Sequence, residues 1–176
     1  MTVTIAPLDP FPRLDDVYAI YARALDGEVA PIDAFRETQL ARHAPRDDFV
    51  FLGASEGDAL VGIAYGYRGR YGQWWTDNVG AAMDDATRRE WLDPPHFEVV
   101  ELHVHPDRQR RGIGKALLDE LLARQPHDRA LLTMNPQSPK ATAFYAREGW
   151  SKLTEVRWTE DAPPRFVLGK RVAQRT

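Results

Sequence analysis

The chain has 176 residues, of which 43% are hydrophobic and 28% charged, and its formal net charge is -3 at pH 7. These values are ordinary for a globular protein, so we expect a single domain over residues 1–176 with a core large enough to fold without disulfides. The absence of cysteine excludes disulfides, thiolate nucleophiles and cysteine-ligated metal sites. Because the net charge of the protein is negative, the molecule as a whole does not attract nucleic acid or anionic lipid.

Two further exclusions concern membranes and secretion. No apolar run has the length of a membrane span, which needs about 20 residues. The segment 1–16 lacks the basic start and the apolar stretch of a signal peptide. We therefore expect a cytoplasmic protein with no membrane partner and no nucleic-acid partner.

The first part of the chain predicts an edge strand, two helices and a β-hairpin. The short alternating segment 2–5 is typical of an edge strand, and apolar residues at helical spacing predict a helix over 14–25. A second helix is expected over 32–43, because a proline follows it closely. The β-rich runs 49–54 and 59–67 flank a Ser-Glu-Gly-Asp turn and predict a hairpin.

Between residues 68 and 95 the pattern is less regular. The glycine-rich and aromatic segment 68–78 predicts a loop. The segment 79–92 predicts one helix that ends before Pro94 and Pro95. This stretch therefore separates the early hairpin from the strand that follows it.

The second half of the chain alternates strands and helices. The expected elements are, in order, a strand over 97–104, a helix over 112–124, a strand over 130–134, a helix over 139–148 and a hairpin of 150–158 with 165–172. Two neighbouring strands joined by a helix are parallel, whereas the strands of a hairpin are antiparallel. The sequence therefore predicts a mixed sheet in an α/β or α+β layer arrangement.

The basic turn between the strand 97–104 and the helix 112–124 is the most informative part of the sequence. It reads Gln109-Arg110-Arg111-Gly112-Ile113-Gly114, and its positive charges come from Arg108, Arg110, Arg111 and Lys115. A turn that opens a helix presents backbone N–H groups and the positive end of the helix dipole. Glycines, which lack a Cβ, let an anion approach that backbone closely. The turn therefore predicts a phosphate site.

Two common nucleotide-binding motifs do not fit this turn. A Walker A loop needs a glycine and then a serine or threonine where the chain has Gln109 and Ala116. A dinucleotide fingerprint needs a third glycine where the chain has Leu117. The pattern Gln109-x-x-Gly112-x-Gly114 instead resembles the acyl-CoA turn of the GCN5-related N-acetyltransferases, the GNAT family.

The context of the turn also resembles this family. A strand precedes the turn, a leucine-rich helix follows it, and the sequence AFYAREGW at 143–150 is similar to a further family element, so the resemblance covers nearly the whole chain. It implies a GNAT-like mixed, mostly antiparallel twisted sheet of about seven strands flanked by helices, with a central strand–turn–helix acyl-CoA site. It also implies acetyl-CoA as co-substrate. Dimerisation is common in the family, so a homodimer is a candidate assembly.

The resemblance assigns cofactor contacts by position. The backbone of Leu102, His103 and Val104 would pair with the pantetheine arm of acetyl-CoA. The pyrophosphate would lie against the amides of the turn, formed by Gln109, Arg110, Arg111, Gly112, Ile113, Gly114 and Lys115. Ser138 stands seven residues before Tyr145, where the family usually has an asparagine that touches the cofactor.

Candidates for the acid and the base follow from the same resemblance. Tyr145 corresponds to the general acid of the family, close to the thioester sulfur. Glu98 corresponds to the catalytic glutamate of the histone-acetylating branch, and Glu101 is a second candidate for the base. A bulge is usual in this strand and would change which glutamate faces the substrate, so both stay open. The pair His103-x-His105 has no evident third ligand, so we expect no metal site.

The sequence therefore supports two functional hypotheses. The first is an acetyl-CoA-dependent N-acetyltransferase that moves an acetyl group to a primary amine of a small molecule or peptide, by direct transfer in a ternary complex. The second is a non-catalytic acyl-CoA-binding sensor or interaction module. Tyr71, Trp74 and Trp75 either line an acceptor pocket or pack over the core.

Overall fold

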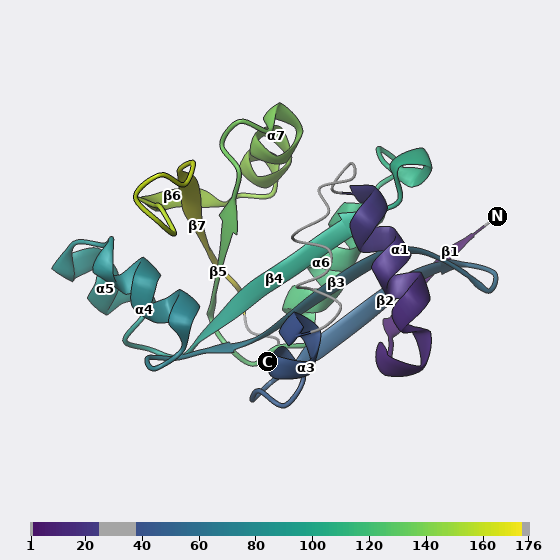
Figure 1. Ribbon diagram of the computed structural model, residues 1–176, viewed down its shortest axis with the longest axis horizontal. Coiled ribbons are helices and arrows are strands. Elements are labelled where there is room, and N and C mark those ends of the chain that lie inside the picture. The colour runs from purple at the N-terminus through teal and green to yellow at the C-terminus, as the bar shows by residue number, and fades with distance from the viewer. Residues whose placement is uncertain (1, 25–37, 174–176) are drawn as a thin grey trace. The chain divides into compact units, whose positions relative to one another are not determined.

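The computed structural model describes residues 2–24 and 38–173, and its elements are labelled in Figure 1. The described strands form one sheet in the order β1-β2-β3-β4-β5-β7-β6. Their bounds are β1 Val3–Pro7, β2 Val50–Glu56, β3 Ala59–Gly69, β4 His96–Val104, β5 Arg129–Met134, β6 Ser151–Val156 and β7 Arg165–Arg171.

The sheet is mixed and mostly antiparallel, as expected. The pairs β1–β2, β2–β3, β5–β7 and β6–β7 are antiparallel, and β4 pairs with β5 in parallel at Phe97 and Glu98. The parallel pair follows from the helical connection between these strands, which brings the chain back to the same end of the sheet. The segment 2–5 was expected at an edge, and β1 is an edge strand.

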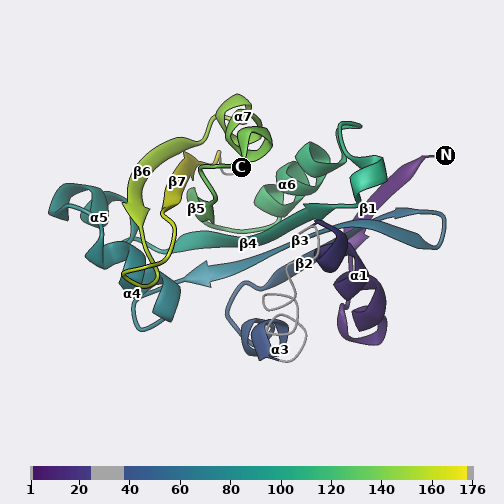
Figure 2. The same ribbon diagram turned by 45° about the horizontal axis from the view of Figure 1, so that its top comes forward.

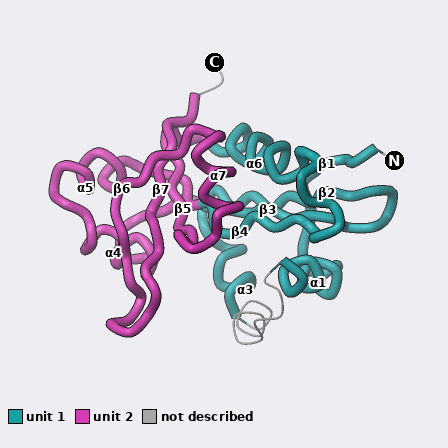
Figure 3. The backbone as a smooth tube through the Cα atoms, turned by 90° about the horizontal axis from the view of Figure 1, so that it is seen from above, with its two compact units in different colours: residues 1–67, 99–125 teal, residues 68–98, 126–176 magenta. Residues whose placement is uncertain are grey.

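The helices differ widely in length. Their bounds are α1 Leu14–Ala24, α3 Leu40–His43, α4 Trp74–Ala81, α5 Asp85–Trp91, α6 Ile113–Ala123 and α7 Pro139–Arg147, with short 3-10 turns at Phe11–Arg13 and Pro106–Arg108. The chain forms two compact units (Figure 3). Unit 1 contains residues 1–67 and 99–125, and unit 2 contains residues 68–98 and 126–176.

Unit 1 is a sheet of β1, β2, β3 and most of β4 with helices on both faces. Figure 2 shows α6 on one face of these strands and α1 and α3 on the other. On the α1 face, the buried core consists of Val17, Ile20, Tyr21, Leu40, Phe51, Ile63 and Tyr65. On the α6 face, a Cβ at Gly62 would lie 3.1 Å from both the His103 carbonyl oxygen and Leu117 Cδ1. Glycine at this position therefore lets β3, β4 and α6 pack closely.

Unit 2 is built around the helices α4 and α5, which pack on β5, β6 and β7. Its buried core consists of Trp75, Val79, Met83, Trp91, Leu92, Leu131, Val156 and Val167. The packing is tight at two glycines, because a Cβ at Gly69 would lie 2.0 Å from His96 Nε2 and one at Gly169 would lie 2.7 Å from Trp91 Cζ3. The Thr154 hydroxyl also donates a hydrogen bond to the Ala82 carbonyl at the end of α4.

The expected loop over 68–78 and the expected single helix over 79–92 were wrong. Residues 74–81 form α4, and α5 begins only at Asp85. The helix α4 forms because Trp75, Thr76, Val79 and Gly80 are buried along one stripe, and this tertiary burial outweighs the loop-like composition. The break follows from Asp84, whose Oδ1 accepts a 2.9 Å hydrogen bond from the Thr87 amide and so starts a new helix.

The other expected elements are confirmed with small shifts at their ends. They are the helix over 14–25, the hairpin of 49–54 and 59–67, and the alternating strands and helices from residue 97 onwards. Of the expected helix over 32–43, residues 32–37 lie outside the described part of the chain. In the ranges 2–24 and 38–173, no helix is long and apolar enough to cross a bilayer. The single domain, the cytoplasmic location and the homodimer stay predictions.

Candidate active site

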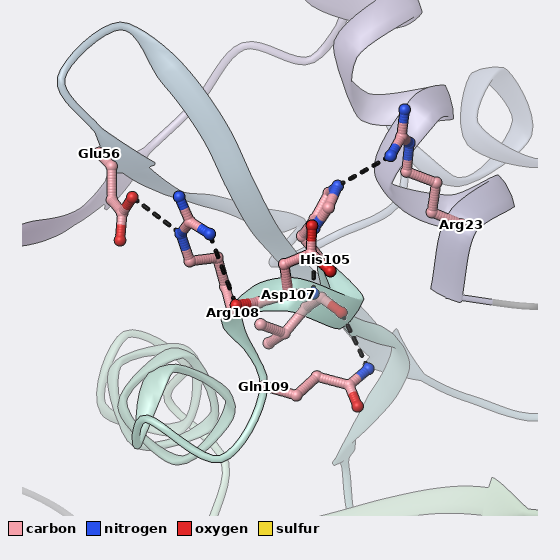
Figure 4. Close-up of polar contacts among 7 residues, drawn as sticks. Arg23, Glu56, His105, Asp107, Arg108 and Gln109 are labelled. Atoms are coloured by element: carbon pink, nitrogen blue, oxygen red, sulfur yellow. Dashed lines mark hydrogen bonds and ion pairs between the residues drawn. The ribbon is translucent and has the colours of Figure 1, made fainter.

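The turn between β4 and α6 is held in shape by its own polar groups (Figure 4). The Gln109 side chain donates a 3.1 Å hydrogen bond from Nε2 to the Val104 carbonyl, which ties the turn to the end of the strand. The Asp107 amide donates to His105 Nδ1 at 3.2 Å, and Arg23 Nη1 of α1 lies 3.2 Å from His105 Nε2. Gln109, the first residue of the motif, was expected to contact the cofactor. In the structure its side chain contacts the backbone of the turn itself.

The backbone of the turn leaves space beside the start of α6. The helix begins after Gly112, which has a φ of 80°, and its first backbone hydrogen bond runs from the Ala116 amide to the Gly112 carbonyl. The amides of Ile113 and Gly114 precede that bond, so they point out of the helix end. A Cβ at Gly112 would meet no atom within 4 Å, and one at Gly114 would lie 3.7 Å from Val104 Cγ2. The geometry therefore fits an anionic group bound at these amides.

The charges around the turn fall into two groups. Arg108 donates to Glu56 at 2.9 Å, and this hydrogen bond lowers the pKa of the Glu56 carboxyl. Lys115 Nζ lies 2.9 Å from the carboxylate of Asp119, one turn further along α6. By contrast, Arg110 and Arg111 are exposed, and Arg110 has a φ of 59°. The two exposed arginines are therefore the side chains of the turn best suited to an anionic ligand from solvent.

On β4, Glu101 and His103 form a close pair. His103 Nε2 lies 2.6 Å from Glu101 Oε2, and each side chain is only 15% exposed. The second carboxylate oxygen, Oε1, accepts a 2.9 Å hydrogen bond from Gln39 Nε2. The His103 ring and the Tyr21 ring of α1 pack edge-on, with 5.0 Å between the ring centroids. Unit 1 therefore contains both the turn and a carboxylate with a donor on each of its oxygens.

A second set of contacts extends this pair towards α3. Gln39 Nε2 also lies 3.2 Å from the Tyr65 hydroxyl, and that hydroxyl lies 3.1 Å from His43 Nδ1. Burial, followed by the nearby charges of Arg46 and Arg42, lowers the pKa of His43 from 6.5 to about 4. His43 is therefore neutral at physiological pH.

The other candidate base, Glu98, has a different environment. It is 4% exposed and lies in unit 2, where it pairs with Leu131 of β5 across the parallel strands. Leu102, His103 and Val104 come after the residues of β4 that pair with β5, and all three are half-buried. The structure thus separates the two glutamates, one among the buried groups of unit 2 and one in the polar network of unit 1.

Tyr145 and Ser138 both belong to α7 and its start, in unit 2. The Tyr145 ring is half-buried and packs edge-on against Phe144 and Trp150, with centroid distances of 5.1 and 5.8 Å. The Ser138 Oγ accepts a 3.3 Å hydrogen bond from the Ala141 amide and caps α7. Ser138 therefore has a helix-capping contact of its own.

The aromatic residues of the 68–95 stretch divide between core and surface. Trp75 is 9% exposed and packs in the core of unit 2, whereas Trp74 is 59% exposed and lies against Trp158 at a centroid distance of 4.9 Å. The exposed Tyr71 donates a 2.8 Å hydrogen bond from its hydroxyl to Asp93. Trp75 thus packs over the core, which is one of the two alternatives that the sequence left open.

Comparison with known proteins identifies the family. The family model described as Acetyltransferase (GNAT) family matches residues 14–150. The chain therefore belongs to the GNAT family of acetyltransferases.

Individual relatives agree with this assignment. The chain is 36% identical over 121 residues to the GCN5-like protein acetyltransferase Rv2170 of Mycobacterium tuberculosis, in a match that covers 63% of this chain and 58% of that protein. Its structure is similar to that of the ribosomal-protein-S18-alanine N-acetyltransferase from Escherichia coli, with 19% identity, a TM-score of 0.65 and coverage of 99% and 97% of the two chains. It is also similar to PaiA N-acetyltransferase from Thermoplasma acidophilum in complex with coenzyme A, with 16% identity, a TM-score of 0.64 and coverage of 97% and 99%.

The sequence did not predict part of the polar network. Gln39, His43 and Tyr65 were not among its candidates, because they come from elements far from the turn along the chain. One signal was present, since Glu101 and His103 are two residues apart and so share a face of the strand. Among the described residues, no group of three or more His, Asp or Glu side chains is placed to hold a metal ion.

Proposed function

We propose that this chain is an acetyl-CoA-dependent N-acetyltransferase that moves an acetyl group to a primary amine by direct transfer in a ternary complex. The observation that carries the proposal is the start of α6, where the Gln109-x-x-Gly112-x-Gly114 turn presents outward amides beside open space. The GNAT family uses acetyl-CoA, and one of the similar structures holds coenzyme A. An amide-lined helix end of this kind is suited to the diphosphate of that molecule.

Binding would use three parts of the chain. The diphosphate lies against the amides of residues 112–115, with Arg110 and Arg111 as counter-charges. The pantetheine arm lies along the backbone of residues 102–104, at the end of β4. Ser138 takes the place of the asparagine that the family usually has near the cofactor.

The chemistry requires one base and one acid. An amine at neutral pH is mostly an ammonium ion, so a base removes one proton before the nitrogen can attack the thioester carbonyl. We assign this role to Glu101, because its carboxylate is oriented by two donors and lies on the same unit as the turn. As the new C–N bond forms and the C–S bond breaks, Tyr145 donates a proton to the sulfur, and the second proton of the nitrogen restores the Tyr145 hydroxyl.

The acceptor is a primary amine of a small molecule or of a peptide. The similarity to a protein named as a GCN5-like protein acetyltransferase supports including lysine peptides among the acceptors to be tested. The exposed Trp74 ring and the half-buried Trp158 ring against it supply apolar surface that suits the aliphatic part of an amine.

A screen for free thiol tests the proposal. Purified protein is incubated with acetyl-CoA and a panel of polyamines, amino acids, aminoglycosides and lysine peptides, and the release of coenzyme A is measured. We expect release with at least one amine, and Tyr145→Phe should lower its kcat by about 100-fold or more with little change in coenzyme A affinity. Tyr18→Phe, the same change on α1, is the control and should keep the rate.

Two results would contradict the proposal. The first is saturable binding of acetyl-CoA with no thiol release for any amine of the panel, which would favour the non-catalytic sensor. The second is a Tyr145→Phe variant as active as the Tyr18→Phe control, which would remove Tyr145 from the mechanism.

A further inference from the structure

We propose that Glu101 and His103 accept the proton of the amine as one pair, and that Gln39, Tyr65 and His43 hold this pair in its working orientation. The last three residues are called the orienting arm. The inference rests on the proposed function and adds to it the residues that position its base. The inference is based on hydrogen bonds between side chains that all belong to unit 1.

The directions of the hydrogen bonds in the orienting arm depend on His43, the residue at its far end. His43 is neutral, because burial lowers its pKa to about 4, so its Nδ1 can accept a hydrogen bond. We assign to His43 the tautomer with its proton on Nε2, in which the Tyr65 hydroxyl, 3.1 Å away, donates to Nδ1 and offers its lone pairs to Gln39. The amide nitrogen of Gln39 has two hydrogens and gives one to Tyr65 and the other to Glu101.

The opposite end of the network fixes the second carboxylate oxygen. Glu101 Oε2 accepts from His103 Nε2 at 2.6 Å, while Oε1 accepts from Gln39. An ionised carboxylate only accepts hydrogen bonds, so both donors point inwards and the carboxylate cannot rotate without losing one of them. The two hydrogen bonds hold the base in one orientation before the substrate arrives.

Buried aromatic side chains pack around this network. Tyr65 and Tyr67 of β3 and Tyr21 of α1 are buried, and the His43 ring packs edge-on against Tyr67 at 4.9 Å. The guanidinium of Arg46 lies over the same Tyr67 ring, 4.3 Å from its centroid. The positive charges of Arg42 and Arg46 act on His43 and favour its neutral form.

The composition of the orienting arm decides where the proton can go. A carboxamide does not take up a proton near neutral pH, so Gln39 orients Glu101 but does not pass protons to Tyr65. The proton lost by the ammonium group therefore stays within Glu101 and His103, whose carboxylate and imidazole both have lone pairs that can accept it. The balanced reaction is ammonium plus acetyl-CoA giving amide, coenzyme A and one proton, and this last proton is the one that the pair holds.

Two variants separate a proton-accepting pair from a purely structural one. His103→Gln keeps an N–H donor for Glu101 but cannot take up a proton. We expect its kcat to fall by about tenfold or more, with an altered acid limb in the pH profile of kcat and an unchanged KM for acetyl-CoA. His127→Gln, the same change in unit 2, is the control and should keep both constants. If His103→Gln is fully active with the wild-type pH profile, His103 only positions Glu101 and the pair is disproved.

The orienting arm is tested at Tyr65. Tyr65→Phe removes the hydroxyl between Gln39 and His43, so we expect a lower kcat and a steeper loss of activity towards acid, with KM for acetyl-CoA unchanged. Tyr18→Phe, the same change on α1 of the same unit, is the control. Equal kcat values for the two variants would disprove the arm.

A measurement without turnover separates this inference from the proposed function. Nitrogen-15 NMR of the whole protein at pH 7 should show His43 protonated on Nε2 and bare on Nδ1, and Tyr65→Phe should change this pattern. A proton on His43 Nδ1 in the wild-type protein would overturn the hydrogen-bond direction, whether or not an amine acceptor is found. If the NMR pattern is as expected but no amine is acetylated, the proposed function fails, and with it the role of the pair.

Discussion

Gly112 and Gly57 share a left-handed backbone conformation but lie at different places in unit 1. Gly112, with a φ of 80°, precedes α6 at the proposed diphosphate site, and Gly57, with a φ of 59°, lies in the turn between β2 and β3. A Cβ at either position would meet no atom within 4 Å. Alanine at either glycine therefore costs backbone strain without a clash, which makes the two positions a matched pair.

We expect Gly112→Ala and Gly57→Ala each to lower the free energy of unfolding by about 1–2 kcal/mol, the cost of a left-handed conformation for a residue with a Cβ. Gly112→Ala should in addition weaken coenzyme A binding, because the new methyl group would enter the space beside the amides. Urea denaturation measures the first effect and titration calorimetry the second. Coenzyme A affinities that are equal in the two variants would argue that this turn does not hold the ligand.

At the scale of single residues, the turn before α6 was predictable from the sequence, whereas the network around Glu101 was not. Two glycines and two arginines between a strand and a helix are informative by themselves, because each residue type limits what the backbone can do. The contact between Gln39 and Glu101 joins residues 62 positions apart, and no local pattern contains it. The choice between Glu98 and Glu101 also needed the structure, since it depends on the neighbours that each carboxyl meets.

At the scale of helices and strands, the sequence predicted best those segments in which buried residues recur at a regular spacing. The helix α6 has Ile113, Leu117, Leu118, Leu121 and Leu122 buried on one face, which is the pattern from which it was inferred. The strand β4 was expected as a continuous strand over 97–104, and it is buried from His96 to Val99 and half-buried from Val100 to Val104.

The stretch 68–95 shows where this reasoning fails. Its glycines suggested a loop, but Gly69 is needed for close packing against His96, and Trp75 places α4 in a core with residues of β5, β6 and β7. A short helix of this kind is stabilised by tertiary contacts rather than by its own propensity, so the local sequence does not reveal it. The capping aspartate, Asp84, was visible in the sequence but was taken as part of one continuous helix.

At the scale of the whole molecule, buried histidines should govern stability in weak acid. Burial lowers the pKa of His96 and of His43 from 6.5 to about 4, so both are neutral in the folded protein. Between pH 6.5 and pH 4 these histidines are protonated in the unfolded chain and neutral in the folded chain. The free energy of unfolding therefore falls as the pH drops from 6.5 to 4. Above pH 6.5 neither state is protonated at these residues and this contribution is constant.

We expect each histidine to account for a loss of at most about 3 kcal/mol between pH 6.5 and pH 4. The variant His96→Phe keeps an aromatic ring at the packed position beside Gly69 but has nothing to protonate. Urea denaturation at pH 7 and pH 4.5 should therefore show a smaller loss of stability for His96→Phe than for the wild-type protein. If both proteins lose the same amount, His96 does not contribute to the acid sensitivity.

The account as a whole depends on the start of α6 holding the diphosphate of coenzyme A, and a comparison of two ligands tests this most directly. Titration calorimetry of the wild-type protein with coenzyme A and with pantetheine, which has the same thiol arm but neither the diphosphate nor the adenosine, measures the contribution of the part of coenzyme A that contains the diphosphate. We predict saturable binding of one coenzyme A per chain and an affinity for pantetheine that is lower by about tenfold or more. Equal affinities for the two ligands, or no saturable binding of coenzyme A, would contradict the account.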